Sequence, residues 1–303
     1  MYDVIILGAG PAGMTAAVYS ARQKMKTLVL TENIGGQTIW SLDIRNYMGY
    51  NLISGIELTE KFRKHVKEYN VELKDGEPAL DLEIAREGFL VKTKKGTYET
   101  KSVIVCSGKK SKKLNVIGED KYRGRGVTYC ATCDGPLFAG KDVAIIGGGN
   151  SCLNAALQMI EIAKKVYIID INSELGGETV AREKIKSSQK VEVINSAKVE
   201  RINGGNFVSS ISLRVSGKKR KIDLQGIIIE IGYTPSVEFA AILAKNQDSE
   251  IIINGKTETN VPGIFAAGDV SNVYGKQIII AAGEGAKASL AAFKYVSTKK
   301  WAV

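Results

Sequence analysis

Two parts of the chain repeat one pattern of apolar and small residues. In each copy, a short run of branched apolar residues precedes a glycine-rich turn, a helical pattern and a second apolar run. The segments are 4–7, 8–13, 14–22 and 27–30 in the first copy, and 142–146, 147–152, 153–162 and 166–169 in the second. Continuous branched apolar runs are typical of strands buried in a parallel sheet. The repeat therefore predicts an α/β fold with two doubly wound, Rossmann-like nucleotide-binding domains.

The order of the other segments predicts that the second domain is inserted into the first. Its last strand is expected over 227–231, and the apolar segments that follow are too few to form a third domain. They are therefore expected to complete the first domain, together with a β-rich stretch over 79–98 and a strand over 102–105. The predicted boundaries are 1–112 for the first part of the first domain, 113–238 for the inserted domain and 239–303 for the second part.

Length and apolar content fit a globular protein without a membrane span. The 303 residues are enough for two domains, and no apolar run approaches the roughly 18 residues that a spanning helix needs. The N-terminus enters a strand-like run almost at once, without the basic segment and apolar core of a signal peptide. We therefore expect a cytoplasmic protein.

Basic residues exceed acidic ones, and the formal net charge is +10. The densest basic runs, 109–113 and 218–221, are expected in loops, and the first of them is interpreted as a linker between the domains. Solvated loops are the simpler interpretation of these runs, and a docking site for an acidic partner is the alternative. No aromatic residues are interleaved with them, so nucleic-acid binding is not expected.

Each glycine-rich turn has the spacing that binds a pyrophosphate. The first small residue permits the tight turn, the second lets the phosphate approach the backbone, and the third lets helix and strand pack closely. The three positions are Gly8, Gly10 and Gly13 in the first copy, and Gly147, Gly149 and Cys152 in the second. The N–H groups and partial positive charge of the following helix would then face the phosphates.

An acidic residue follows the second apolar run of each copy. Glu32 lies two residues beyond the first of these runs, and Asp170 directly follows the second. An acid in this position accepts hydrogen bonds from ribose hydroxyls. A carboxylate at Asp170 would also repel a 2′-phosphate, so the sequence favours NAD(H) over NADP(H).

Two of the four cysteines, Cys130 and Cys133, are separated by only two residues. A zinc site would need a second close pair or histidines, and the only histidine, His65, lies in a charged helical stretch where a surface position is expected. Cys130 and Cys133 can close a disulfide within one helical turn, and a helix N-terminus lowers the pKa of a thiol. Asp134 is the nearest titratable group and a candidate acid–base residue.

Two other interpretations of this pair are an inert buried pair and half of a zinc site. A dithiol beside two dinucleotide folds nevertheless favours redox chemistry. Flavin can accept a hydride and pass two electrons to a disulfide, whereas a nicotinamide alone does this poorly.

Along nearly its whole length, the chain resembles the low-molecular-weight thioredoxin reductases, and more closely the reductase part of the alkyl hydroperoxide reductase flavoprotein subunit. The segments that carry the resemblance are 8–13, Gly35-Gly36-Gln37, Asn46-Tyr47, 126–130, 133–136, 147–151, 263–270 and 276–290. The resemblance implies FAD in the split first domain, a pyridine nucleotide in the inserted domain, and a homodimer in which the inserted domain swings. It also implies that Cys133 lies nearest the flavin, that Cys130 attacks the partner disulfide, and that Asp134 moves the proton.

The resemblance, together with the turns described above, assigns residues to both cofactors. The FAD candidates are Gly8, Gly10, Pro11, Ala12, Gly13, Glu32, Gly35, Gly36, Gln37, Asn46, Gly108, Gly268, Asp269, Lys276, Gln277 and Ile278. The NAD(P)H candidates are Gly147, Gly149, Asn150, Ser151 and Asp170. Asp269 is expected on the ribitol or pyrophosphate side of FAD, and Gln277 is expected near the isoalloxazine.

Three departures from the family pattern change the expectations. The basic His-Arg-Arg cluster of NADPH-dependent members is replaced by Asp170-Ile171-Asn172-Ser173, although Arg182 lies downstream. Cys106 stands in a Cys-Ser-Gly segment where the family has Ala-Thr-Gly, and it is expected to be a small buried residue. The chain also lacks the N-terminal thioredoxin-like domains of the peroxide-system flavoprotein, so its electrons are expected to leave to a separate protein.

The leading hypothesis is electron flow from NADH through FAD and the Cys130–Cys133 dithiol to a thioredoxin- or glutaredoxin-like protein. One alternative keeps this dithiol and takes electrons from reduced ferredoxin, an acidic protein that could dock on a basic surface. A second alternative is a flavin-binding redox sensor without turnover, against which the complete Cys130, Cys133 and Asp134 set argues.

Overall fold

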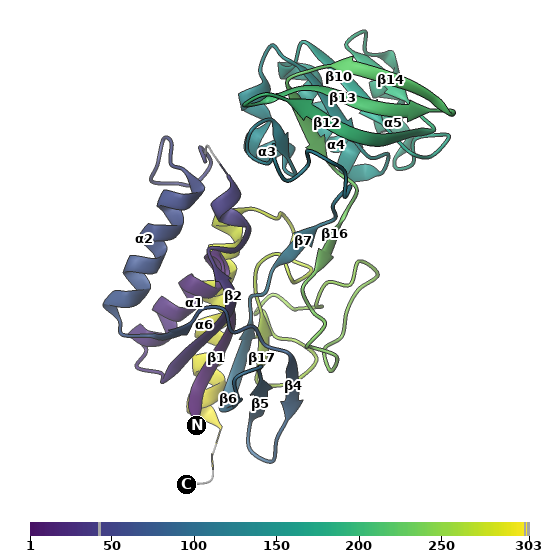
Figure 1. Ribbon diagram of the computed structural model, residues 1–303. Helices are drawn as coiled ribbons and strands as arrows, with labels where there is room; N and C mark the ends of the chain where they lie inside the picture. Colours follow the sequence, from purple (N-terminus) through teal and green to yellow (C-terminus); the bar gives the residue numbers. More distant parts are fainter. Residues whose placement is uncertain (42–43, 300, 302–303) are drawn as a thin grey trace. The chain divides into compact units, whose positions relative to one another are not determined.

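A computed structural model describes residues 1–41, 44–299 and 301. The chain divides into two compact units, which can be followed in Figure 1 by their colours. Of the described residues, unit 1 contains 1–39, 44–110, 234–299 and 301, and unit 2 contains 40–41 and 111–233. The prediction of two Rossmann-like domains, the second inserted into the first, agrees with this division.

Unit 1 is built on a sheet with a parallel centre. Its strand order is β3-β2-β1-β6-β5-β4, and β17 pairs with β6. Strands β1, β2, β3, β6 and β17 run parallel, whereas β4 and β5 form an antiparallel extension. The bounds are β1 (Tyr2–Ala9), β2 (Thr27–Ile34), β3 (Glu72–Lys74), β4 (Asp81–Ile84), β5 (Phe89–Lys92), β6 (Thr97–Val105) and β17 (Ile264–Ala266).

Alternating side chains of β1 contribute to the two cores on either face of the unit 1 sheet. Val4 and Ile6 pack into the core under helices α1 (Pro11–Arg22) and α6 (Ile278–Thr298). Ile5 and Leu7 belong to the core on the opposite face of the sheet. A strand buried on both faces needs this continuous apolar run, which explains the pattern in the sequence. Helix α2 (Gly55–Glu68) packs against α1, and a short 3-10 helix, η1, covers Gly36–Trp40.

Unit 2 has a fully parallel sheet with helices and a second sheet packed against it. The strand order is β11-β10-β9-β15-β8, and β12, β13 and β14 form a separate antiparallel sheet (Figure 1). The strands are β8 (Val127–Thr128), β9 (Asp142–Ile146), β10 (Lys165–Ile169), β11 (Val191–Ile194), β12 (Ala197–Gly204), β13 (Val208–Val215), β14 (Lys218–Asp223) and β15 (Gly226–Ile229). The helices are α3 (Ala131–Asp134), η2 (Gly135–Phe138), α4 (Asn150–Ile162) and α5 (Thr179–Ser187).

The same alternation organises unit 2 around β9. Val143 and Ile145 pack with α4 and α5, whereas Ala144 and Ile146 pack with β12 and β13. All four side chains are almost fully buried. Unit 2 therefore has two apolar cores of its own, one on each face of its parallel sheet.

The chain passes between the units at 110/111 and 233/234 rather than at the predicted 112/113 and 238/239. Lys112 N donates to Gly232 O at 2.9 Å, and both residues belong to unit 2. In unit 1, Ser236 N donates to Gly108 O at 3.0 Å, and Val237 is buried in the core of that unit. Sequence patterns could not predict these contacts, because they join segments more than 100 residues apart.

The prediction that both basic runs lie in loops was wrong. Lys218–Asp223 is strand β14, whose only buried residue is Ile222. It lies at the edge of its sheet, where lysines prevent pairing with another chain. Lys109–Ser111 is strand β7, which pairs with β16 (Tyr233–Pro235). His65 is exposed, as predicted, and none of the described helices is both long and apolar enough to cross a membrane.

Because both of its cores lie within its own residues, unit 2 should fold alone. We expect the excised segment 111–233 to show one cooperative urea transition by circular dichroism. Ile145→Ala in this segment should lower the free energy of unfolding by about 2–5 kcal/mol, since it removes fully buried methyl groups. A non-cooperative transition, or no effect of Ile145→Ala, would contradict the assignment of an independent unit.

Candidate redox and nucleotide site

The first glycine of each turn is required by the fold itself. Gly8 and Gly147 have φ angles of +113° and +132°. A Cβ on Gly8 would lie 2.3 Å from the carbonyl oxygen of Cys106, and one on Gly147 would lie 2.3 Å from that of Glu230. Only glycine accepts both the backbone conformation and the close contact.

The second glycine of each turn has no such steric requirement. A Cβ on Gly10 or Gly149 would meet no protein atom within 4 Å. Both residues have extended backbones and directly precede helices, α1 and α4 respectively. The open space therefore lies at a helix N-terminus, where a pyrophosphate would approach the backbone. The residues at each turn therefore leave room for the pyrophosphate of a dinucleotide.

The third position differs between the turns. A Cβ on Gly13 would lie 1.9 Å from Gly8 O, so helix and strand are in close contact there. In unit 2 this position is Cys152, which is fully buried and has a free thiol. Burial raises the pKa of Cys152 and of Cys106, the other free cysteine, so both thiols stay protonated and unreactive. The prediction that Cys106 is a small buried residue is confirmed.

Several FAD candidates contact the first turn or one another, all within unit 1. Asn46 Nδ2 donates to Gln277 Oε1 at 3.0 Å. A Cβ on Gly36 would lie 3.7 Å from Gly10 Cα, and one on Gly268 would lie 3.1 Å from Ala12 Cβ. Two further candidates begin helices: Pro11 begins α1 and Ile278 begins α6. Three others are placed by hydrogen bonds. Gly35 N donates to Ala9 O, Gln37 Nε2 donates to Lys109 O, and Gly108 O accepts from Ser236 N.

Asp269 is a partly buried carboxyl that directly follows Gly268. Burial raises its pKa, and the positive charges of Lys109 and Lys276 oppose that shift. Lys276 Nζ also lies 2.9 Å from Glu250 Oε1. A partly buried carboxyl of this kind is suited to accept a hydrogen bond from a hydroxyl of a bound cofactor.

Glu32 is placed differently from the sequence-based expectation. The first copy's second strand continues to Ile34, so Glu32 lies inside β2 instead of beyond its end. Its exposed carboxylate pairs with Lys110 Nζ at 2.9 Å. The ribose role of Glu32 stays a prediction.

Asp170, by contrast, is held under the second turn. It is 3% exposed and lies directly after β10. A Cβ on Gly148 would lie 1.8 Å from Asp170 Oδ2, so the carboxylate lies against the turn. Asn172 donates to Asp170 Oδ1 through both its backbone N, at 3.3 Å, and its Nδ2, at 3.2 Å. Sequence reasoning missed Asn172, although an Asp-x-Asn segment is a recognisable turn signal.

Asn150 and Ser151, the remaining NAD(P)H candidates, begin helix α4. Asn150 Oδ1 accepts a hydrogen bond from Glu178 N at 2.9 Å. This contact ties the helix start to the segment that precedes α5.

Cys130 and Cys133 form a disulfide at the start of α3. Their Cα atoms are 5.3 Å apart, and the S–S distance is 2.22 Å. Cys130 is the N-cap of α3, and its Sγ accepts a hydrogen bond from Cys133 N at 3.1 Å. Both cysteines are only partly buried, unlike Cys106 and Cys152. The pair is therefore a closed, partly exposed disulfide.

Asp134 ends α3 and is linked to the dithiol through a residue that sequence reasoning did not select. Thr128 Oγ1 donates to Asp134 Oδ2 and accepts from Cys130 N at 3.2 Å. The only signal in the sequence was the position of Thr128 inside the segment 126–130.

The residue before the dithiol, Tyr129, is fixed by two hydrogen bonds. Its hydroxyl donates to buried Glu119 at 2.7 Å, and its carbonyl accepts from Tyr233 Oη at 2.6 Å. Glu119 also accepts from Leu114 N and Asn115 N. Burial raises the pKa of Tyr129, and the hydrogen bond to Glu119 adds to that shift. The residue directly before Cys130 is therefore fixed through both its side chain, by Glu119, and its carbonyl, by Tyr233.

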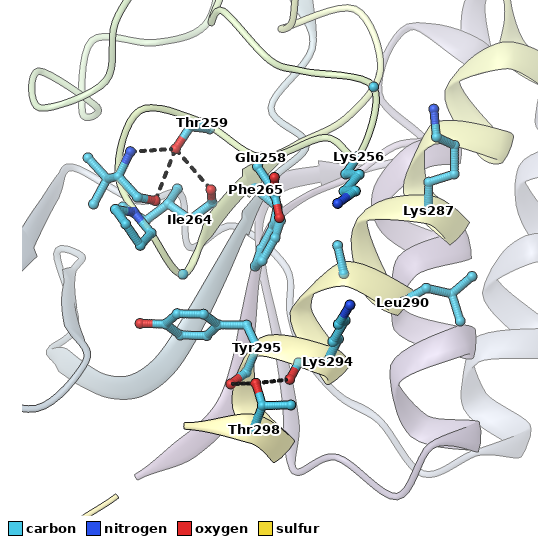
Figure 2. A pocket seen from close by; sticks show the side chains of 15 residues that line it. Lys256, Glu258, Thr259, Ile264, Phe265, Lys287, Leu290, Lys294, Tyr295 and Thr298 are labelled. Atoms are coloured by element: carbon cyan, nitrogen blue, oxygen red, sulfur yellow. Dashed lines mark hydrogen bonds between the residues drawn. The ribbon is translucent and has the colours of Figure 1, made fainter. Parts of the chain in front are cut away.

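A separate cavity of about 710 Å³ lies in unit 1 between residues 255–265 and the second half of α6 (Figure 2). Lys256 and Lys294 border it, together with Leu290 and Tyr295. None of the candidate cofactor or dithiol residues is among its lining residues.

Comparison with known proteins gives consistent matches over the whole chain. A family model described as pyridine nucleotide-disulphide oxidoreductase matches residues 2–285. The F subunit of alkyl hydroperoxide reductase from Escherichia coli (strain K12) is 43% identical, over 99% of this chain and 59% of its own length. NADH dehydrogenase of Bacillus subtilis (strain 168) is 37% identical, over 97% of this chain and 58% of its own. The chain thus spans somewhat more than half the length of these relatives.

Among solved structures, thioredoxin reductase from Streptococcus pyogenes MGAS5005 matches with a TM-score of 0.94 and 34% identity. The match covers 99% of both chains. The resemblance inferred from the sequence and the predicted fold class are therefore confirmed.

The different steric settings of Gly8 and Gly10 predict different consequences of substitution. Gly10→Ala should change the free energy of unfolding of the apoprotein by no more than about 0.5 kcal/mol, because its Cβ meets no protein atom. It should weaken FAD binding at least about tenfold, because the methyl group occupies the space for the pyrophosphate. Fluorescence titration with FAD and thermal unfolding of the apoprotein measure the two effects.

Gly8→Ala is the matched control, and it should destabilise the apoprotein by about 2 kcal/mol or more. If Gly10→Ala bound FAD as tightly as the unmodified protein, the assignment of the pyrophosphate to the space at Gly10 would be wrong.

Proposed function

Since this chain belongs to the pyridine nucleotide-disulphide oxidoreductase family, we propose that it reduces a protein disulfide with electrons from NADH, through FAD and the Cys130–Cys133 dithiol. The observation that supports this most directly is the partly buried disulfide at the start of α3, in a chain with two dinucleotide turns. Structural cysteines are buried and inert, as Cys106 and Cys152 are here.

FAD would be held by unit 1. Its pyrophosphate would lie over Gly10 at the N-terminus of α1, where the backbone N–H groups are free to donate. Asn46, Asp269 and Gln277 would contact the rest of the cofactor. When bound, FAD supplies the conversion between a two-electron hydride donor and a disulfide.

The dithiol would act by two successive exchanges. The Cys130 thiolate attacks one sulfur of the partner disulfide, and the partner's other sulfur leaves, taking a proton from Asp134. The Asp134 carboxylate then takes the proton of the Cys133 thiol, and the resulting Cys133 thiolate attacks Cys130 Sγ, which restores the Cys130–Cys133 disulfide. The second partner sulfur leaves and takes that proton from Asp134. Two electrons leave the chain for each partner disulfide that is opened. The assignment of Cys130 to the partner and Cys133 to the flavin follows the family resemblance.

The partner we propose is a thioredoxin- or glutaredoxin-like protein, and the acting form is a homodimer. Support comes from the similarity to a thioredoxin reductase and to the F subunit of alkyl hydroperoxide reductase. The first name refers to the reduction of thioredoxin and the second to the reduction of a hydroperoxide.

Asp170 supports NADH as the donor. Its carboxylate is buried against the second turn and is held by Asn172, and a fixed negative charge in this position would repel a 2′-phosphate. One of the relatives is named NADH dehydrogenase, which agrees with this preference.

The dithiol assignment is tested by single substitutions. We expect Cys130→Ser or Cys133→Ser to lower NADH-dependent reduction of a thioredoxin disulfide to the uncatalysed rate, because each removes one step of the exchange. Cys106→Ala, which changes a buried thiol only, should keep the activity. Unchanged turnover in Cys133→Ser would refute the dithiol mechanism, and turnover in neither the unmodified protein nor its variants would support a redox sensor.

The donor assignment is tested by anaerobic titration of the flavin absorbance with NADH, NADPH and reduced ferredoxin. NADH should bleach the flavin most readily, and Asp170→Ser should improve the kcat/KM for NADPH relative to NADH by about tenfold. Asp223→Ser, which removes an exposed acid of unit 2, is the control and should not change the ratio. Bleaching by ferredoxin but by neither nucleotide would transfer the donor role to ferredoxin.

A further inference from the structure

Thr128 occupies a junction between the sheet of unit 2 and the dithiol. It is the last residue of β8 and pairs with Ile228 of β15, which fixes its backbone. Its side chain is 7% exposed. The hydroxyl reaches both ends of the short α3 segment, because it accepts from Cys130 N and donates to Asp134 Oδ2.

We infer that Thr128 is the positioning residue of the acid–base group, holding the Asp134 carboxyl beside the dithiol in both of its protonation states. This inference rests on the proposed function, since it assumes that Asp134 exchanges a proton with a thiol. Nothing in the sequence pattern alone assigned a role to Thr128.

A hydroxyl is suited to this task because it can both donate and accept. It has one proton and two lone pairs, and one lone pair is taken by Cys130 N. When Asp134 is ionised, the hydroxyl proton points to the carboxylate, as the observed hydrogen bond indicates. After Asp134 takes up a proton, the second lone pair of the hydroxyl can accept it. The carboxyl group therefore needs no new partner while the proton is transferred.

The residue type at position 128 also limits movement. Threonine is branched at Cβ, so few side-chain rotamers are available to it. Thr132 offers a contrast within α3 itself, because it is exposed and bonds only to Gln158 among the contacts described. The buried threonine, and not the exposed one, therefore connects the acid to the backbone of Cys130.

The test uses two disulfide probes that differ in their need for a proton. The aromatic thiolate released from 5,5′-dithiobis(2-nitrobenzoate) is a stable leaving group, whereas the alkyl thiolate released from bis(2-hydroxyethyl) disulfide must be protonated. The FAD-loaded protein is reduced with a phosphine, which is then removed, and single-turnover exchange with each probe is followed by stopped flow.

Thr128→Val keeps the branched shape but removes the hydroxyl. We expect it to slow exchange with the alkyl probe by about tenfold. This is smaller than the rate acceleration of about 10²–10⁴ that general acid–base catalysis supplies, because Asp134 itself is retained. Its rate with the aromatic probe should stay within about twofold of the unmodified protein, because that leaving group needs no acid. Thr128→Ser should restore the alkyl rate.

Thr100→Val is the matched control. Thr100 is also a buried strand threonine, whose hydroxyl donates to Ser102 O at 2.8 Å in unit 1. Its loss should leave both probes unaffected.

The possible outcomes distinguish failure of the Thr128 role from failure of the dithiol function. If Thr128→Val slows both probes equally, or neither, the positioning role is wrong and the hydroxyl serves only packing. If the unmodified protein exchanges with neither probe, or if Cys130→Ser exchanges as fast, the dithiol function itself fails. Failure of Thr128→Ser to restore the alkyl rate would also overturn the inference, because serine retains the hydroxyl.

Discussion

The contact between the first glycine of each turn and a carbonyl from the neighbouring strand is the constraint on which both units depend. In unit 1, Gly8 lies against the carbonyl of Cys106, just after β6. In unit 2, Gly147 lies against the carbonyl of Glu230, just after β15. Any side chain at these positions would push the turn away from the adjacent strand. The turn would then no longer bring the N-terminus of α1 or α4 to the edge of the sheet, where open space remains at Gly10 and Gly149.

Burial sorts the four thiols into two classes. Cys106 and Cys152 lie under the turns, where loss of solvation raises the pKa of each thiol and keeps it unreactive. Cys130 and Cys133 are partly exposed, and their backbone is held by Thr128, Tyr129 and the hydrogen-bond partners of these two residues. Oxidation and thiol exchange are therefore restricted to Cys130 and Cys133, because the two buried thiols stay unreactive.

The sequence was sufficient to predict the repeated fold, the insertion and the dithiol, because each is a local pattern. The apolar runs of β1 and β9 are strands of parallel sheets, as expected. The failures concern features that depend on distant partners. The basic run over 218–221 is a strand only because β13 lies beside it, and Glu32 lies in an extended β2 with Lys110 as its neighbour.

Candidate site residues show the same division. Glycines at the turns were predictable, because their spacing reflects a requirement of the backbone. Thr128 and Asn172 were not, because their importance lies in the orientation of a side chain toward Asp134 or Asp170. Local sequence contains both partners in each case, but it does not show which of several nearby polar groups they contact.

The insertion also orders the events of biosynthesis. Residues 111–233 leave the ribosome as one continuous stretch, with both of their cores complete. Unit 1 must wait for β17 and α6, which are synthesised after unit 2; β17 pairs with β6 in the sheet and α6 packs on α1. During that interval the apolar face formed by Val4 and Ile6 lacks part of its cover. The early half of unit 1, and not the inserted unit, is therefore the segment of the nascent chain that most needs a chaperone.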